Sequence, residues 1–279
     1  RANNAGEFVG IYSICSAERS VLEAGMTQAA RDDVLILIEA TTNQVNQFGG
    51  YTGMKPLDFR TFVHAIAAEV GLPEARIVLG GDHLGPHVWR AEPGATAMGR
   101  AVDLVREYVL AGFTKIHLDA SMRLADDPSD RPLDEATVAQ RAAQLCAVAE
   151  EAAALLPDGA SRPVYVVGSE VPIPGGELAD SAAPAVTTLE AIERTLDETR
   201  RAFVRHGLEG ALERILAIVT QPGVEFGDAV VFEYDDDDAA ALAARTPIEA
   251  PLIYEAHSTD YQTEDALRRM VRDHFAILK

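Results

Sequence analysis

The segment Gly80–Pro86, GGDHLGP, sets an acidic side chain directly before an imidazole, with glycines on both sides. A neutral imidazole is a common ligand for zinc and similar ions, and a neighbouring carboxylate can move protons on a substrate. Adjacent side chains on a regular strand face opposite ways, so both reach one site only where the strand turns. We therefore expect Asp82 to be a catalytic residue and His83 a metal ligand at a strand end.

A second imidazole, His257 in the segment YEAHSTDYQ, also follows an apolar run. Histidines at the ends of two strands can share one metal ion, so His257 is a second candidate ligand. His117 lies inside an apolar run, and the sequence leaves open which way its side chain faces. The other histidines are expected at the surface or as helix caps: His64, His87, His206 and His274.

Polar side chains follow nearly every apolar run of the chain. Buried charges are costly without partners, so loop polarity alone explains poorly why Glu39, Asp119 and Glu170 come directly after such runs. The amides and hydroxyls of residues 41–53 suit the hydroxyls of a sugar, although a lid or an oligomer contact would also explain this segment. The candidate substrate-binding residues are Glu39, Asn43, Gln44, Asp119, Ser121 and Lys279.

The elements that would position these residues are visible as two alternating periodicities. Short apolar runs predict strands over residues 8–15, 34–40, 76–80, 115–119, 164–168, 215–220, 252–256 and 275–278. Amphipathic stretches between them predict helices over residues 17–31, from 56, 95–111, 134–156, 189–206 and 263–273, with a short alanine-rich helix before residue 252. This alternation predicts one α/β domain over residues 1–279, a (β/α)₈ TIM barrel whose last helix would lie beyond residue 279.

Two alternatives to this assignment are weaker. An open doubly wound sheet would carry a glycine-rich phosphate loop after its first strand, but the segment there is SICSAERS. The acidic run Asp235–Asp238 is expected to be a solvated loop, because consecutive side chains cannot all converge on one ion. Reading the carboxyl ends of barrel strands as the active-site rim, we expect a metal-assisted site for a small sugar.

The composition limits the partners. The formal net charge of −20 would repel nucleic acid and anionic lipid, and an anionic substrate would need a local positive field. No apolar run reaches the roughly 20 residues of a membrane-spanning helix, and residues 1–7 contain no signal-peptide core. Cys15 and Cys146 are far apart in sequence and are expected to be reduced thiols of a cytoplasmic protein.

Several long segments resemble one known family. IEATTNQVNQFGGYTGM, GGDHLGP, GFTKIHLDAS, GSEVPIPGG, QPGVEFG and EAHSTDYQ are similar to the GatZ/KbaZ family, in one register over essentially the whole chain. Its members are described as the non-catalytic or chaperone-like subunit of class II tagatose-1,6-bisphosphate aldolase, and some carried an older label of tagatose 6-phosphate kinase. The resemblance implies tagatose or galactitol catabolism and the catalytic aldolase subunit as a partner. The chain has no P-loop lysine motif or kinase loop signature, so kinase activity is not expected.

The family is similar in turn to the catalytic class II ketose-bisphosphate aldolases, which are zinc-dependent barrels. This resemblance implies proton transfer by Asp82 and Glu170, metal binding by His83 and His257, and a phosphate-binding turn at Ser258 and Thr259. The catalytic aldolases have a further metal histidine after the sixth strand, where this chain has Gln221, with Glu225 nearby. Either the zinc site is broken or it is rebuilt with these oxygen ligands, which would favour manganese or magnesium.

Two functions therefore remain open from the sequence. The first is a partner subunit that stabilises a separate aldolase without turning over substrate. The second is a metal-dependent 4-epimerase that interconverts tagatose 6-phosphate and fructose 6-phosphate by retro-aldol cleavage and re-addition. The sequence does not choose among the metal, Lys279, Arg123 and the Ser258–Thr259 amides as the phosphate site, nor between a monomer and a homo-oligomer.

Overall fold

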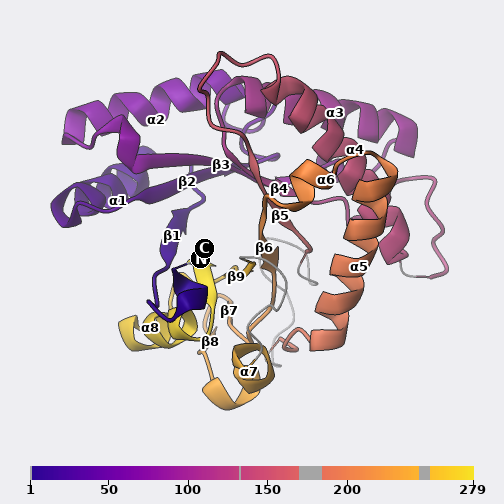
Figure 1. Cartoon of the computed structure of the whole chain (residues 1–279). Helices are drawn as coiled ribbons and strands as arrows, with labels where there is room; N and C mark the ends of the chain where they lie inside the picture. The colour runs from indigo at the N-terminus through magenta and orange to yellow at the C-terminus, as the bar shows by residue number, and fades with distance from the viewer. Residues whose placement is uncertain (1, 132, 170–183, 245–251) are drawn as a thin grey trace. The chain divides into compact units, whose positions relative to one another are not determined.

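Strands and helices alternate along the chain as the two periodicities predict. The computed structural model describes residues 2–131, 133–169, 184–244 and 252–279 (Figure 1). Its parallel strands form a closed barrel in the order β1-β10-β9-β6-β5-β4-β3-β2, which confirms the (β/α)₈ fold. These strands are β1 Ile11–Ile14, β2 Ile36–Thr41, β3 Ile77–Leu84, β4 Lys115–Leu118, β5 Val164–Val167, β6 Ile215–Val219, β9 Ile253–Ala256 and β10 Phe275–Leu278.

The helices lie close to their predicted positions. Asp58 accepts a hydrogen bond from the backbone N–H of Lys55 at the start of α2, and the predicted cap Thr263 accepts one from Ala266 at the start of α8. No described helix is long and apolar enough to cross a membrane. The helices are α1 Arg19–Asp32, α2 Pro56–Val70, α3 Gly94–Leu110, α4 Glu135–Ala153, α5 Leu189–Arg205, α6 Glu209–Leu212, α7 Asp236–Ala243 and α8 Glu264–Arg272.

The prediction of a solvated loop over Asp235–Asp238 is wrong. Asp235 caps α7 by accepting a hydrogen bond from the backbone N–H of Asp237, and the other three aspartates form the first turn of the helix. Carboxylates are favourable there because they face the unpaired N–H groups and the positive end of the helix dipole. Asp236 also forms ion pairs with Arg269 and Arg272 of α8. The acidic run is thus a helix start rather than a loop.

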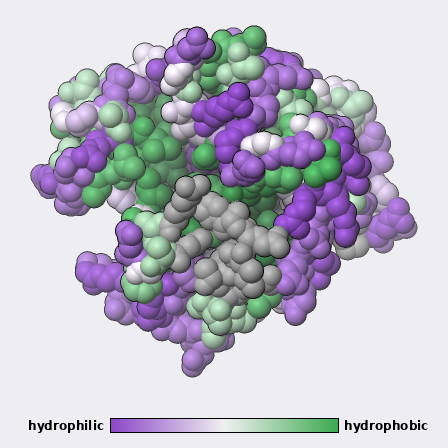
Figure 2. All heavy atoms as spheres, viewed as in Figure 1, coloured by the Kyte–Doolittle hydropathy of each residue, from purple (hydrophilic) through white to green (hydrophobic). Residues whose placement is uncertain are grey.

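Contacts divide the chain into two compact units. The larger unit comprises Ser13–Val166 and Glu198–Arg214, and the smaller unit comprises Arg1–Tyr12, Val167–Asp197 and Ile215–Lys279. The expectation that residues 1–279 form one domain stays a prediction. In the larger unit, α2 buries Phe59, Val63 and Ile66 on one face, as an amphipathic helix should. Figure 2 shows hydrophilic residues over much of the visible surface, in keeping with the acidic composition.

Strand register arranges side chains of the larger unit in layers. Glu39 of β2 pairs with Gly80 of β3, and Gly80 pairs with Lys115 of β4. Two residues further along, Thr41 pairs with Asp82. Because side chains two apart on a strand share a face, Glu39 and Lys115 form one layer, and Asp82 and His117 form the next layer towards the carboxyl ends.

Candidate metal centre

The end of β3 departs from regular strand geometry. The strand continues to Leu84, beyond the predicted end at residue 80, and its register with β4 shifts between Gly81 and Leu84. His83 lies at this irregularity with a φ of 45°, in the left-handed region that non-glycine residues rarely adopt. An extra residue in one strand changes which face the following side chains occupy. The irregularity therefore allows Asp82 and His83 to face the same cluster, although they are neighbours in sequence.

Two hydrogen bonds hold the backbone of His83 in this conformation. Its N–H lies 3.2 Å from Nδ1 of His117, and its carbonyl accepts a hydrogen bond of 2.8 Å from the hydroxyl of Thr42. Unusual backbone geometry persists only where surrounding groups determine it, and it is frequent at functional sites. The left-handed conformation of His83 is therefore held by a residue of β4 and by the residue that directly follows β2.

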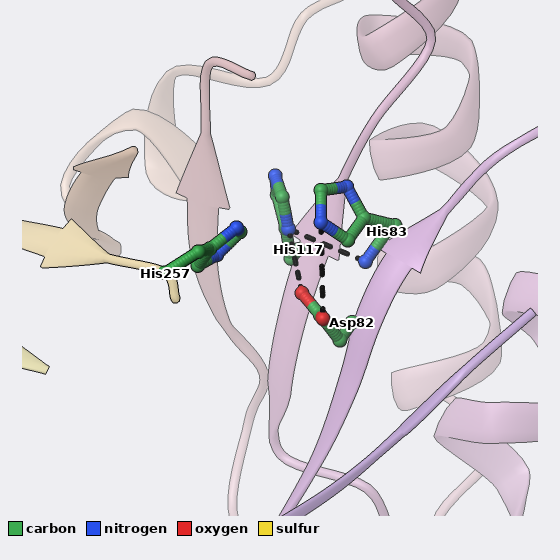
Figure 3. A group of neighbouring side chains, drawn as sticks. All are labelled: Asp82, His83, His117 and His257. Atoms are coloured by element: carbon green, nitrogen blue, oxygen red, sulfur yellow. Dashed lines mark hydrogen bonds and ion pairs between the residues drawn. The ribbon is translucent and has the colours of Figure 1, made fainter. Parts of the chain in front are cut away.

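Asp82, His83 and His117 form a buried group that we call the β3–β4 cluster. Figure 3 shows the carboxylate and the two rings pointing towards one another from the ends of β3 and β4. Each residue offers a ligand atom, and these atoms lie within 4.8 Å of one another. Nδ1 of His117 is 3.0 Å from Oδ1 of Asp82, and Nε2 of His83 is 3.8 Å from Oδ2. One carboxylate and two imidazoles are compatible with a divalent metal ion.

Asp119 orients one of the two imidazoles. Its Oδ2 lies 2.7 Å from Nδ1 of His83, and its Oδ1 accepts hydrogen bonds from the backbone N–H and the hydroxyl of Ser121. Burial would raise the pKa of Asp119, but the bond with His83, the charge effects of both histidines and the bond from Ser121 together hold that pKa well below its usual range. An ionised Asp119 keeps the proton on Nδ1 of His83 and leaves Nε2 as the ligand atom.

This arrangement changes the roles expected for two residues. Asp119 and Ser121 were expected to bind substrate, whereas the structure commits the Asp119 carboxylate to His83 and to Ser121. A carboxylate behind a metal-binding histidine is a common supporting feature, because it sets the tautomer and the orientation of the ring. His117 is the residue that sequence reasoning left unassigned. The available signal was its place two residues before Asp119 on a predicted strand.

Glu39 is also not free to bind substrate in the way the sequence predicts. Its two carboxylate oxygens lie 3.0 and 2.7 Å from Nζ of Lys115, and one of them accepts a 2.7 Å hydrogen bond from Ser13. The side chains of Glu39 and Lys115 are 0% and 2% exposed. A Cβ on Gly80 would come within 2.6 Å of the Glu39 carboxylate, so glycine is required between them. The result is a buried ion pair one layer below the β3–β4 cluster.

The loop after β2 supports the cluster rather than opening towards a sugar. Oε1 of Gln44 accepts a hydrogen bond from the backbone N–H of Thr41, and its Nε2 donates to the carbonyl of Cys15. The thiol of Cys15 lies 3.6 Å from Oδ2 of Asp82. Asn43 is exposed on the same loop. Of these residues, Asn43 is the one whose side chain is exposed.

The second thiol and two further polar residues are not members of the cluster, although His87 lies near enough to interact with its charges. Burial raises the pKa of Cys146 in α4 to about 12, so this thiol is inert. Arg123 is exposed and donates to the backbone carbonyls of Ser129 and Arg131 within its own loop. His87 was expected at the surface or at a cap, but its Nδ1 is buried without a hydrogen-bond partner in the described part of the chain. Burial lowers the pKa of His87, which favours the neutral ring.

In the smaller unit, polar side chains gather at the ends of β9 and β10. Nζ of Lys279 is 2.7 Å from Oε1 of Glu255 and 3.3 Å from Nε2 of His257, and that Nε2 is 3.2 Å from the same oxygen. Ser258 has a φ of 58°, and both the N–H and the hydroxyl of Thr259 donate to the carbonyl of Lys279. Those two groups of Thr259 therefore stabilise the turn instead of pointing at a phosphate.

The two oxygen ligands suggested after the sixth strand are already engaged. Oε1 of Gln221 accepts a 2.8 Å hydrogen bond from the N–H of Gly223, and Oε1 of Glu225 accepts one from the N–H of Phe226. Glu225 belongs to a short antiparallel hairpin that the sequence did not predict, formed by β7 Glu225–Phe226 and β8 Val231–Phe232. Glu170, the expected second catalytic carboxylate, lies outside the described residues.

Comparison with known proteins gives relatives over nearly the whole chain. Residues 1–279 match the family described as D-tagatose-1,6-bisphosphate aldolase subunit GatZ/KbaZ-like. The D-tagatose-1,6-bisphosphate aldolase subunit GatZ of Klebsiella pneumoniae subsp. pneumoniae is 53% identical over 278 residues, which is 99% of this chain and 64% of that protein. The subunit of the same name from Salmonella typhimurium is 53% identical over 277 residues, again 99% and 64%. The chain thus spans less than two thirds of the length of these relatives.

Solved structures agree with this relationship. A crystal structure from Sinorhizobium meliloti 1021, titled "a probable tagatose 6 phosphate kinase", is 48% identical with a TM-score of 0.86 and covers 97% of this chain and 64% of its own. A fructose-bisphosphate aldolase from Campylobacter jejuni is 12% identical with a TM-score of 0.51, over 99% and 72%, and it shares the fold. The match over the full chain and the identity to the two bacterial subunits show that this chain belongs to the GatZ/KbaZ-like family of D-tagatose-1,6-bisphosphate aldolase subunits.

Proposed function

We propose that this chain is the barrel of a GatZ/KbaZ-type subunit of tagatose-1,6-bisphosphate aldolase, acting on phosphorylated ketoses in the cytoplasmic catabolism of tagatose and galactitol. The names of its relatives support the assembly with a catalytic aldolase subunit. The β3–β4 cluster is the observation that carries the chemical part of the proposal, because three buried ligand residues converge there. A site of this kind favours binding of a small polar substrate beside a metal ion.

His83 and His117 would hold the divalent ion beside the carboxylate of Asp82, and the resemblance to the class II aldolases makes His257 a further candidate ligand. His257 directly follows β9, a strand end of the kind that carries active-site residues in such barrels. Two or three imidazoles favour zinc or manganese over magnesium, which prefers oxygen ligands. When bound, such an ion polarises a substrate carbonyl and stabilises the negative charge that develops on its oxygen.

The residues of the chain supply orientation and proton transfer. Asp119 holds the Nδ1 proton of His83, so that imidazole keeps one tautomer. Asp82 offers the carboxylate that accepts or returns the proton of a substrate hydroxyl, and Glu170 would do the same on the opposite face of the sugar. The ammonium of Lys279 supplies positive charge for a phosphoryl group in an otherwise acidic chain.

A mixing experiment tests the subunit assignment. We expect the purified protein to show no ketose cleavage alone and to lengthen the half-life of the catalytic aldolase subunit when the two are combined. The variant Asp82→Asn is the matched control, because a stabilising partner should not need this carboxylate. An aldolase whose half-life and activity do not change on addition of the protein would contradict the assignment.

The buried cluster itself favours a second candidate, a stand-alone tagatose 6-phosphate 4-epimerase. A scaffold alone has no need of a carboxylate and two imidazoles buried together. Cleavage of the C3–C4 bond would release the C4 hydroxyl proton to a carboxylate and form an enediolate and an aldehyde. Re-addition to the other face of the aldehyde would return the proton and invert C4.

The epimerase is tested by incubating the protein with tagatose 6-phosphate and Mn²⁺ and measuring fructose 6-phosphate. Here Asp82→Asn should abolish conversion, in contrast to its neutral effect on stabilising the aldolase. The absence of product with Mn²⁺, Zn²⁺ and Mg²⁺ alike would rule out this candidate. Consumption of ATP added to the same mixture would instead support the older kinase label.

A further inference from the structure

Gln221 is held more tightly than its position in a connecting segment requires. It directly follows β6 and its side chain is buried, with 3% of the residue exposed. Its backbone N–H donates to the hydroxyl of Thr187 at 2.7 Å, and its carbonyl accepts from the N–H of the same residue at 2.9 Å. Both polar backbone groups are therefore satisfied within the smaller unit.

The side-chain amide has a single orientation in this setting. Oε1 accepts the N–H of Gly223 at 2.8 Å, across Pro222, and Gly223 adopts a φ of 95° that suits glycine. Rotating the amide by half a turn would set its NH₂ group against another donor, which is unfavourable. The oxygen of Gln221 is thus used by its own turn, and the nitrogen points elsewhere.

That nitrogen, Nε2, is buried and has no hydrogen-bond partner among the residues that the structure describes. Buried polar groups are nearly always paired, so an unpaired donor in a rigid setting indicates a missing acceptor. An amide NH₂ has two donors and no acceptor, so its partner must be an oxygen that accepts. A bound metal ion cannot be that partner, because a cation has no lone pair to offer.

The donor lies at the carboxyl end of β6, next to the end of β9 in the smaller unit. Val219 pairs with Glu255, and the N–H of Thr220 continues the pairing by donating to the carbonyl of Glu255. Gln221 and His257 each lie two residues beyond this pair. Lys279 Nζ is 3.3 Å from His257 Nε2, so an ammonium lies at the end of β9 as well.

We propose that Gln221 binds an acceptor oxygen of the phosphorylated ketose through Nε2 and is not a metal ligand. This inference rests on the proposed sugar-phosphate function and assigns a substrate contact to the position where the catalytic aldolases have a metal histidine. The acceptor is a phosphoryl oxygen or an oxygen of the sugar itself.

Gln221→Glu is the sharpest test. The substitution keeps the size of the side chain and the oxygen that accepts from Gly223, and it replaces the NH₂ donor by a second oxygen that also brings negative charge. We expect the Mn²⁺ affinity to be retained and the tagatose 6-phosphate affinity of the Mn²⁺-loaded protein to fall roughly tenfold or more, as for loss of one hydrogen bond to a charged acceptor. Isothermal titration of Mn²⁺, and then of tagatose 6-phosphate, measures both quantities on one preparation.

Gln221→Met provides a second variant that carries no new charge. It should show the same separation, with Mn²⁺ affinity kept and sugar-phosphate affinity lowered, and it keeps the test valid if Gln221→Glu does not fold. Titration of inorganic phosphate and of unphosphorylated tagatose identifies the oxygen, because only the ligand that carries it should lose affinity in the variants.

Three outcomes would overturn the inference. Variants that bind tagatose 6-phosphate as tightly as the wild type would overturn this inference and leave the proposed function intact. A Gln221→Met protein that loses Mn²⁺ while Gln221→Glu keeps it would make Gln221 an oxygen ligand of the metal. A wild-type protein that binds Mn²⁺ but no sugar phosphate would overturn both this inference and the proposed function.

Discussion

The two units each contain a buried lysine–glutamate pair, and the pairs differ in what else they touch. In the larger unit, Lys115 contacts both oxygens of Glu39, and the pair lies one layer below the β3–β4 cluster. In the smaller unit, Lys279 contacts one oxygen of Glu255, and His257 approaches both the lysine and that oxygen. The Glu39 carboxylate is bonded by Ser13 as well as by its lysine, whereas the Glu255 carboxylate is shared with a candidate metal ligand.

We infer from this difference that the Glu39–Lys115 pair stabilises the fold and that the Glu255–Lys279 pair takes part in ligand binding. A buried carboxylate whose two oxygens both contact one ammonium is electrically neutral together with it, and the pair supports the layer of side chains above it. A carboxylate shared between an ammonium and an imidazole responds to any change in the charge of that imidazole. We therefore expect perturbation of Glu39–Lys115 to change stability, and perturbation of Glu255–Lys279 to change ligand binding.

The largest expected effect is the loss of stability on breaking the Glu39–Lys115 pair. Lys115→Met should lower the free energy of unfolding by about 3–5 kcal/mol, because it leaves a buried carboxylate without its compensating charge. Lys279→Met should cost less, roughly 1–3 kcal/mol, because His257 remains within reach of Glu255. Urea-induced unfolding of both variants measures the two values, and equal losses would remove the distinction between the pairs.

The next effect concerns the histidines and asks whether both units supply metal ligands. His117→Ala and His257→Ala should each weaken Mn²⁺ binding by more than the roughly 10- to 100-fold that loss of an outer supporting partner costs. His64→Ala is the matched control, since His64 pairs with Glu74 on the surface of the larger unit. Unchanged Mn²⁺ affinity in His257→Ala alone would confine the metal site to the β3–β4 cluster.

A smaller effect is expected for the residue that orients His83. Asp119→Asn should lower Mn²⁺ affinity by roughly 10- to 100-fold while leaving every direct ligand in place. The affinities of this variant and of His83→Ala, measured by the same titration, should differ, with the larger loss in His83→Ala. A greater loss in Asp119→Asn would make Asp119 itself a direct ligand.

The lowered pKa of Asp119 also predicts a pH dependence. The unfolded chain binds the Asp119 proton below about pH 4, whereas the folded chain does not until its lower pKa is reached. This contribution to stability is therefore complete above about pH 4 and is lost as the pH falls towards the folded pKa. Unfolding free energies measured between pH 5 and pH 3 should fall more steeply for the wild type than for Asp119→Asn, and parallel profiles would contradict the assignment.

The sequence predicts the fold well because each element carries its own local signal. Alternating periodicities, the acid at Asp58 and the cap at Thr263 depend on residues close in sequence, and the structure has each of them where expected. The prediction for the acidic run at Asp235 was wrong because a helix start and a loop have similar compositions. The hairpin β7–β8 was not predicted because two-residue strands are too short to show a periodicity.

The site is predicted less completely, because the partners of a side chain depend on register across strands. Sequence reasoning found Asp82 and His83, but it treated Glu39 and Asp119 as substrate ligands. Their partners, Lys115 and His83, lie on neighbouring strands and are 76 and 36 residues away along the chain. His117 could be assigned a direction only once Lys115 and Asp82 had fixed the register of β4 against β3.

The smallest expected effect compares the left-handed residues of the two units. His83 has a side chain in the candidate metal site, whereas Ser258 contributes a positive φ to its turn. Ser258→Gly removes the strain of a positive φ but adds freedom to the unfolded chain, so the free energy of unfolding should change by less than about 1 kcal/mol. Tagatose 6-phosphate affinity should then be unchanged in titration. A loss of affinity without a loss of stability would assign the contact to the Ser258 hydroxyl and give this turn of the smaller unit a side-chain role, as His83 has in the larger one.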